Sequence, residues 1–155
     1  MNLAPSTLAV LAPVPGRVMP MTDVPDPVFA GSVVGPGAAL DPRRLRQQVV
    51  APIAGRIGKL HPHAFVVVTP DGRGVLVHLG IDTVELKGAG FTLLAVEGDE
   101  VEAGSPIIDW DPAVIEAGGR SPVCPVVALG ASADDIRVVA YGGDLAVGAA
   151  LFTWS

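Results

Sequence analysis

Short apolar runs alternate with clusters of glycine and proline along almost the whole chain. Most runs span roughly four to seven residues at spacings of about ten, and the helical period of three to four residues is weak. Runs of this length between turn-forming residues are typical of β-strands. The pattern therefore predicts an all-β, single-domain sandwich or barrel of short antiparallel strands, with one or two short helical turns.

Two segments of the chain repeat one another. Residues 10–18 read VLAPVPGRV and residues 49–57 read VVAPIAGRI, with five of nine positions identical. A second repeated pattern is Gly-Asp followed by a valine and another glycine. It occurs in EGDEVEAGSPI (97–107) and GGDLAVGAALF (142–152), with a looser copy in VVGPGAAL (33–40). Proline cannot donate a ladder hydrogen bond and glycine permits a bend, so the repeats predict turns that lead into short strands.

The best helix candidate is DPAVIEAGG, residues 111–119. Asp111 suits the N-cap, Pro112 the first helical position and Gly118 the end. DPRRLRQQ (41–48) is either a turn of helix or a surface loop, and SADDIRVVA (132–140) is expected to begin with a short turn.

Composition narrows the class of protein. The 155 residues are about one domain's worth, half of them are hydrophobic, and the net charge is −6. Basic residues cluster only at positions 43–46, which argues against nucleic-acid binding. The apolar runs are too short to span a membrane. The single cysteine, Cys124, reads as a small buried hydrophobe, and we see no signal peptide, so we expect a cytoplasmic protein.

A predicted hairpin carries two histidines. HAFVVVT (63–69) and GVLVHLGI (74–81) flank PDGR, whose Asp-Gly pair is a strong turn signal. Strand alternation places His63 on one face with Phe65, and His78 on one face of the second strand. A connecting loop with an even number of residues would make these the same face and bring the imidazoles within reach. An odd loop would separate them.

Two neighbouring imidazoles suit phosphoryl transfer. A neutral imidazole nitrogen can attack a phosphoryl group and hold it, while a second imidazole donates a hydrogen bond to the phosphoryl oxygens. Gly80 would allow close approach of another backbone segment. An apolar rim would exclude water from a labile phosphohistidine and form a docking face. We assign to this rim Phe29, Phe65, Leu76 and Val84.

Other readings of the same residues stay open. His61-Pro-His63 and His78 to Asp82 have spacings that could ligate zinc, as in lysostaphin-type peptidases, although the two patterns occur here in reversed order. This alternative is a zinc-binding hydrolase-like domain. A third class is a regulatory module whose partners read its phosphorylation state. The histidines could also simply pack, and the aspartates could serve turns.

Several segments together resemble a known family. VHLGIDTVELKGAGF (77–91) closely resembles the active-site signature of glucose-type enzyme IIA (EIIA) domains of the bacterial phosphoenolpyruvate-dependent sugar phosphotransferase system (PTS). The resemblance extends to residues 10–40, to VVAPIAGRIGKL (49–60), to HAF (63–65) and to the turn GDEVEAGSPI. It covers nearly the whole chain from Val10.

The resemblance implies a duplicated hybrid motif at residues 10–155, after an N-terminal extension at 1–9. It implies a cytoplasmic phosphocarrier: the protein HPr donates to His78, giving a tele-phosphohistidine, and His78 passes the group to a cysteine of an EIIB domain, free or within an EIICB sugar permease. His63 would stabilise the phosphoryl group, and regulatory proteins are possible further partners. No cofactor and no metal are implied. Asp82, Asp26 and Gly80 would flank the site, and partners would dock on Phe29, Val33, Val34, Phe65, Leu76 and Val84.

One departure from the family concerns the residues before His63. Family members carry a longer segment there, with a threonine that helps to orient the active histidine. Here the stretch is shortened to LHPHAF, the threonine has no counterpart and His61 is extra. We therefore expect another group to set the tautomer of His78. Glucose and N-acetylglucosamine are both compatible as the sugar.

Overall fold

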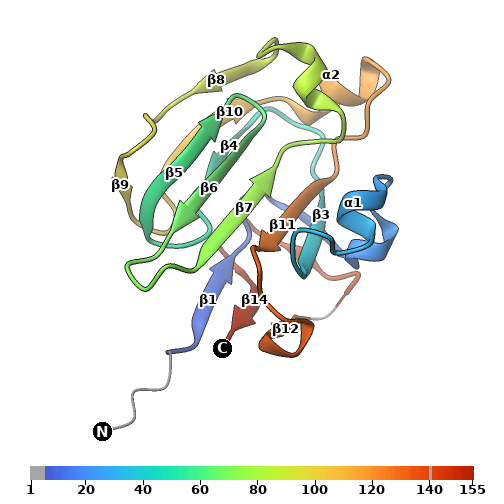
Figure 1. The fold of residues 1–155 in the computed structure, drawn as a ribbon. Helices are drawn as coiled ribbons and strands as arrows, with labels where there is room; N and C mark the ends of the chain where they lie inside the picture. Colours follow the sequence, from blue (N-terminus) through green and yellow to red (C-terminus); the bar gives the residue numbers. More distant parts are fainter. Residues whose placement is uncertain (1–5, 140) are drawn as a thin grey trace, which may run out of the picture.

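The computed structural model describes residues 6–139 and 141–155 and confirms the predicted all-β fold (Figure 1). The strands of the first half are β1 (Leu8–Leu11), β2 (Gly16–Met19), β3 (Gly37–Pro42), β4 (Gln47–Val50), β5 (Gly55–His61), β6 (Ala64–Val68) and β7 (Gly74–His78). Those of the second half are β8 (Phe91–Leu93), β9 (Glu100–Val101), β10 (Pro106–Trp110), β11 (Cys124–Ala128), β12 (Ile136–Val138), β13 (Asp144–Leu145) and β14 (Ala150–Trp154). The first strand thus begins at Leu8, two residues before the expected start of the domain.

The strands form one large sheet and two small ones. The large sheet has eight strands in the order β13-β2-β3-β11-β7-β6-β5-β9. The small sheets have the orders β1-β14-β12 and β4-β10-β8. All the ladders are antiparallel, and β1 lies beside the C-terminal strand β14 (Figure 1).

The two sequence repeats occupy equivalent places in the fold. The first copy forms β1 and β2, and the second forms β4 and β5. Leu11 N–H donates to the carbonyl of Pro52 at 2.9 Å, and Val50 N–H donates to the carbonyl of Pro13 at 3.0 Å. Leu11 and Pro13 occupy the same positions in the first copy as Val50 and Pro52 in the second. The two copies therefore hold one another by reciprocal hydrogen bonds.

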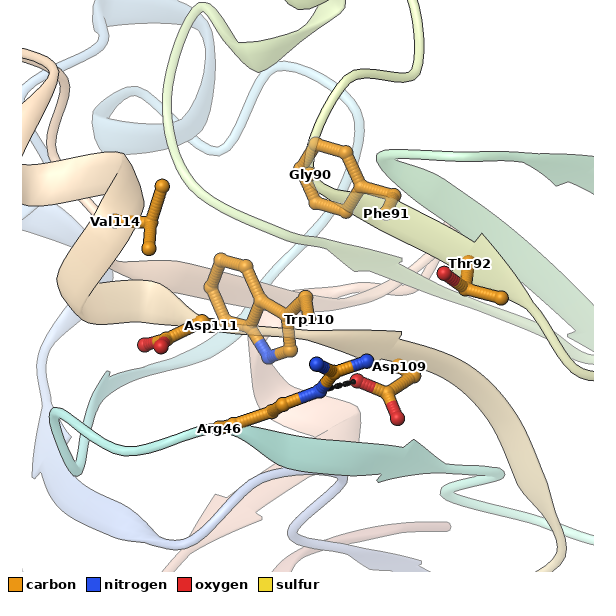
Figure 2. Close-up of a pocket in the computed structure, with 8 residues that line it drawn as sticks. All are labelled: Arg46, Gly90, Phe91, Thr92, Asp109, Trp110, Asp111 and Val114. Carbon is orange, nitrogen blue, oxygen red and sulfur yellow. Dashed lines mark hydrogen bonds and ion pairs between the residues drawn. The ribbon is translucent and has the colours of Figure 1, made fainter.

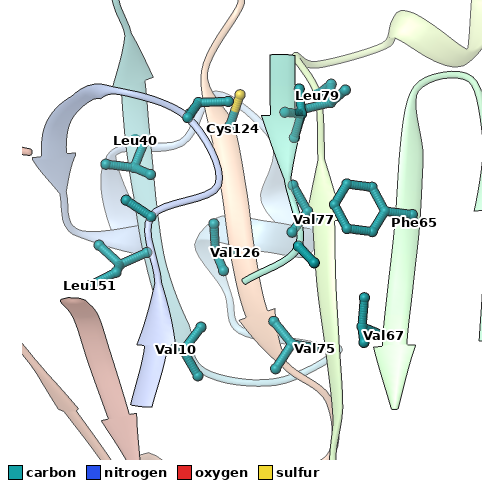
Figure 3. Packing of buried hydrophobic residues seen from close by; sticks show 14 of the residues in the cluster. Val10, Leu40, Phe65, Val67, Val75, Val77, Leu79, Cys124, Val126 and Leu151 are labelled. Atoms are coloured by element: carbon teal, nitrogen blue, oxygen red, sulfur yellow. The ribbon is translucent and has the colours of Figure 1, made fainter. Parts of the chain in front are cut away.

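The core lies between the sheets. Figure 3 shows Phe65 and Val77 pointing into it from neighbouring strands of the large sheet, and Val10 entering from β1. Cys124 is fully buried there, and burial raises the pKa of its thiol to about 12. Its predicted role as a small buried hydrophobe is confirmed, because a protonated thiol in a closed core is unreactive.

Short helices interrupt the strands. Helix α2 (Pro112–Ala117) confirms the prediction, and its N-cap Asp111 accepts from Ala113 N–H at 2.9 Å. The segment 41–48 is the end of β3, a loop and the start of β4, so the loop alternative was right. A 3-10 turn, η3 (Ala133–Asp135), occupies the segment expected to begin with a turn. Within the described part of the chain, no helix is long and apolar enough to cross a membrane.

Three elements near the site were not predicted as helices. Helix α1 (Pro27–Ala30) follows Asp26, whose carboxylate accepts from Val28 N–H at 2.8 Å. This is the same Asp-Pro signal that predicted α2, on a segment too short to show a helical period. A 3-10 turn, η2 (Thr83–Leu86), follows Asp82, and another, η1 (Met21–Asp23), precedes α1.

Gly16, the glycine of the first repeat, has no room for a side chain. A Cβ built on Gly16 would lie 2.2 Å from the carbonyl oxygen of Asp41 on the paired strand. We expect Gly16→Ala to lower the free energy of unfolding by at least ~2 kcal/mol, because the backbone of β3 must move. The matched control is Gly118→Ala, where the nearest atom is 3.4 Å away and φ is −79°. Its effect should stay within ~1 kcal/mol in urea denaturation followed by circular dichroism. Equal effects at the two sites would contradict the prediction.

Candidate functional site

The two predicted histidines meet at one end of the large sheet. His78 is the last residue of β7, and His63 lies in the two-residue turn between β5 and β6. Their ring centroids are 5.2 Å apart and the rings stand nearly edge to face, at 72°. The sequence therefore identified the right pair of imidazoles.

The loop of the hairpin does not have the even number of residues that would place both histidines on one face. Val68 pairs with Gly74, so the loop has five residues, and Ala64 lies opposite His78. The imidazoles meet nevertheless, because His63 belongs to the turn before β6 and strand alternation does not govern the direction of its side chain. Turn residues adopt other backbone angles than strand residues.

A backbone carbonyl fixes the tautomer of His78. Its Nδ1 lies 2.6 Å from the carbonyl oxygen of Gly80, which can only accept, so Nδ1 carries the proton and donates. The lone pair of the neutral ring then resides on Nε2. This carbonyl is the group expected to replace the family's threonine in setting the tautomer.

Only glycine fits at position 80. Its φ is +78°, and a Cβ there would lie 2.7 Å from the Thr83 methyl carbon and 3.0 Å from the Ser121 carbonyl oxygen. Thr83 is fully buried and its hydroxyl donates to the carbonyl of Leu79 at 2.7 Å. The expected close backbone approach at Gly80 is present, and the supporting residues Thr83 and Ser121 were missed by the sequence analysis.

The surroundings keep His78 neutral. Burial lowers its pKa below the usual 6.5, while the Gly80 carbonyl and the charges of Asp26 and Asp82 oppose this shift. Asp82 sits in the left-handed backbone region at φ +59°, and Asp26 caps α1. Both aspartates therefore have a local role at the start of a helical turn, and their charges also raise the pKa of the His78 imidazole. A neutral ring with a free Nε2 is the nucleophilic form.

The extra histidine, His61, stacks on His63. Their ring centroids are 5.8 Å apart and the rings are inclined by only 26°. The pKa of His63 is lowered first by burial, then by charge on His78 and on His61. His61 itself is exposed at the end of β5.

One apolar side chain, Phe29, lies against the histidine pair, and most of the predicted rim residues are at least partly exposed. The Phe29 ring lies 5.2 Å from the His78 ring, centroid to centroid. Val33 is 72% exposed and Val84 58%, while Leu76 and Phe29 are half-buried. Val34 is exposed as well, and so is Val28 on α1, which the sequence analysis missed. The sequence feature that could have pointed to Val28 is the N-cap Asp26 before Pro27.

Phe65 does not belong to this surface. It is 1% exposed and packs in the core beside Val77, its partner across the ladder. Its assignment to the docking rim is wrong, because the odd loop turns it to the inner face of the sheet.

No metal-ligating cluster supports the zinc alternative. Among residues 6–139 and 141–155, no three His, Cys, Asp or Glu side chains are placed to hold one ion. His61, His63, His78 and Asp82 therefore gather around the site without forming a ligand set.

Comparisons with known proteins place this fold and site in one class, the phosphotransferase components of sugar uptake systems. The model of the family described as phosphoenolpyruvate-dependent sugar phosphotransferase system, EIIA 1, matches residues 8–133. The chain belongs to this family, and its role is that of a PTS phosphocarrier.

Relatives and a solved structure agree with the family. Two relatives are each named PTS system glucose-specific EIIA component. One, from Halalkalibacterium halodurans, is 41% identical over 126 residues, which are 80% of this chain and 72% of that protein. The other, from Haemophilus influenzae, is 39% identical over 142 residues, 90% of this chain and 83% of that protein. The structure of glucose permease IIA from Mycoplasma capricolum superposes with a TM-score of 0.86 at 28% identity, covering 99% of both chains.

Prediction for the stacked histidines. We expect His61→Gln to raise the pKa of His63, because protonation of His63 no longer meets a second positive charge at the stacked ring. The measurement is a titration of the imidazole Cε1–H resonances by NMR. His78 serves as the internal control, since its pKa shift has no contribution from His61. An unchanged or lower pKa of His63 would refute the effect.

Proposed function

We propose that His78 accepts a phosphoryl group on Nε2 from phospho-HPr and passes it to a cysteine of an EIIB domain, free or within an EIICB permease. The observation that supports this most directly is the hydrogen bond from His78 Nδ1 to the Gly80 carbonyl, which leaves the Nε2 lone pair available. HPr and EIIB are the partners that the family implies.

The electrostatics suit both the free and the phosphorylated ring. The Nε2 lone pair attacks phosphorus in line, a nitrogen–phosphorus bond forms, and the bond to the HPr nitrogen breaks with its electron pair returning to HPr. The ring keeps its Nδ1 proton and gains positive charge. The Gly80 carbonyl, Asp26 and Asp82 favour that charge, as their effect on the pKa of His78 indicates.

His63 is the partner that steadies the phosphoryl group. Its ring stands edge to face against His78 at 5.2 Å, so a nitrogen of His63 can reach oxygens of a group bound at Nε2. We propose that this contact strengthens when the phosphorus moves toward the EIIB cysteine.

The docking surface is the exposed apolar rim, formed by Phe29, Val33, Val34, Leu76 and Val84, to which we add Val28. Modest aliphatic contacts suit transient partners. The curated relatives' names point to a glucose-type permease, and glucose or N-acetylglucosamine is the sugar we expect it to carry. Because HPr and EIIB act in the cytoplasm in this family, we place the chain there.

Prediction for the phosphoryl acceptor. Incubation with enzyme I, HPr and phosphoenolpyruvate should add one acid-labile phosphoryl group to the protein, seen by intact mass. His78→Ala should gain none, although it keeps His61 and His63. Circular dichroism of the variant tests that its fold is retained. Label that persists on His78→Ala would overturn the assignment.

Prediction for the partner imidazole. His63→Gln should still accept the phosphoryl group, because Nε2 of His78 stays free. Its transfer to an isolated EIIB domain should slow by about 10²-fold, the usual effect of losing one donor to a developing charge. Rapid-quench kinetics would measure both half-reactions. A variant that passes phosphate at the native rate, or cannot be labelled, would contradict this role.

A further inference from the structure

A cavity away from the histidine pair lies on the small sheet β4-β10-β8, where α2 begins (Figure 2). Its volume is about 300 Å³, at the lower end of the range of small-molecule sites. Arg46 enters from the loop before β4, Phe91 from β8, Trp110 from β10 and Val114 from α2. The histidine pair lies on the other, eight-stranded sheet. The proposed phosphoryl transfer therefore uses none of the residues of this cavity.

Trp110 brings an unpaired donor to this cavity. The residue is 1% exposed, and within the described part of the chain its Nε1 has no hydrogen-bond partner. Figure 2 shows the nitrogen-bearing edge of the indole turned toward Arg46, which is also a donor and cannot accept. A buried unpaired donor costs about 1–3 kcal/mol. Because Nε1 is itself closed to solvent, an oxygen acceptor would recover that free energy once the exposed side chain of Arg46 moves to admit it.

The rest of the lining offers acceptors and an apolar wall. One carboxylate oxygen of Asp109 accepts a hydrogen bond from Arg46 Nε–H at 2.9 Å, and Asp111 lies at the start of α2. The rings of Phe91 and Trp110 stack at 6.0 Å and 12°, and Val114 is 59% exposed beside them. Two carboxylates disfavour an anionic ligand, whereas donors and acceptors beside an aromatic wall suit a neutral polyhydroxylated ring.

We propose that this cavity binds a neutral monosaccharide. One oxygen of the sugar accepts from Trp110 Nε1–H and from Arg46, a hydroxyl donates to Asp109, and the apolar face of the ring lies against Phe91 and Val114. The site is distinct from the histidine pair and needs no phosphoryl transfer to operate.

The indole N–H itself reports binding. The chain has two tryptophans, Trp110 and Trp154, so a ¹H–¹⁵N spectrum separates the cavity from an internal control. We expect titration with glucose or N-acetylglucosamine to shift the Trp110 indole signal saturably, while the Trp154 signal stays in place. The open-chain polyol sorbitol should not reproduce the shift. Trp110→Phe assigns the signal.

Variants of the ion pair Arg46–Asp109, which lies outside the buried core, test the site. Arg46→Gln and Asp109→Asn should each weaken binding by about fivefold or more, because each removes a charged hydrogen-bonding group. The matched control is Arg43→Gln, whose guanidinium pairs with Asp144 instead, at 2.7 Å. Its affinity should equal that of the native protein.

Three results would overturn the proposal. The first is the absence of a Trp110 shift up to about 100 mM sugar, a concentration well above a ~10 mM Kd. The second is an equal shift of both indole signals. The third is native affinity in Arg46→Gln and Asp109→Asn. Labelling of His78 from phosphoenolpyruvate, followed in the same variants, shows separately whether the phosphocarrier role holds.

Discussion

The hydrogen bond from His78 Nδ1 to the Gly80 carbonyl joins the fold to its chemistry. It exists because the chain turns sharply after β7, with φ of +78° at Gly80. The turn is held from behind, where Ile81 N–H donates to the Ser121 carbonyl at 2.9 Å and the buried Thr83 hydroxyl donates to Leu79. Any side chain at position 80 would push against these supports, so the tautomer of His78 depends on the absence of a Cβ two residues later.

The duplicated framework holds the strands that lead to this turn. The reciprocal hydrogen bonds between the repeats, from Leu11 to Pro52 and from Val50 to Pro13, fix β1 and β2 against β4 and β5. β3, which follows the first repeat, and β7, which belongs to the hairpin after the second, both pair with β11 in the centre of the large sheet. All three histidines fall on the β5–β7 side, so an approximately duplicated scaffold carries a single site.

The sequence predicted what depends on local pattern and missed what depends on register. Apolar runs between glycine and proline predicted the strands, and Asp111-Pro112 predicted α2, because caps and turns are local signals. The Asp71-Gly72 turn was visible but its loop length was not, so Phe65 was assigned to the wrong face. A one-residue difference in a loop reverses every side chain of a strand, and composition does not reveal it.

The site residues divide in the same way. His78 and His63 were recognisable from the signature, while the support that Ser121 gives Gly80 is a contact between distant segments. Even the correct pairing of the histidines came from a wrong register, since a tight turn carries His63 to the ring of His78. Side chains in turns escape strand alternation, so an argument from alternation fails first at the ends of strands.

In the proposed relay the same surface serves two partners in succession, and its composition suits that task. Val33, Val84 and Val28 present short aliphatic groups that are 72%, 58% and 45% exposed. Burial of such groups against any apolar partner surface stabilises the complex, and it requires no fixed hydrogen-bond geometry. The two imidazoles at the centre provide directional hydrogen-bonding groups. In the proposed relay, partner choice can then rest on shape around the rim, and the direction of transfer on whether the acceptor brings an imidazole or a thiolate to Nε2 of His78.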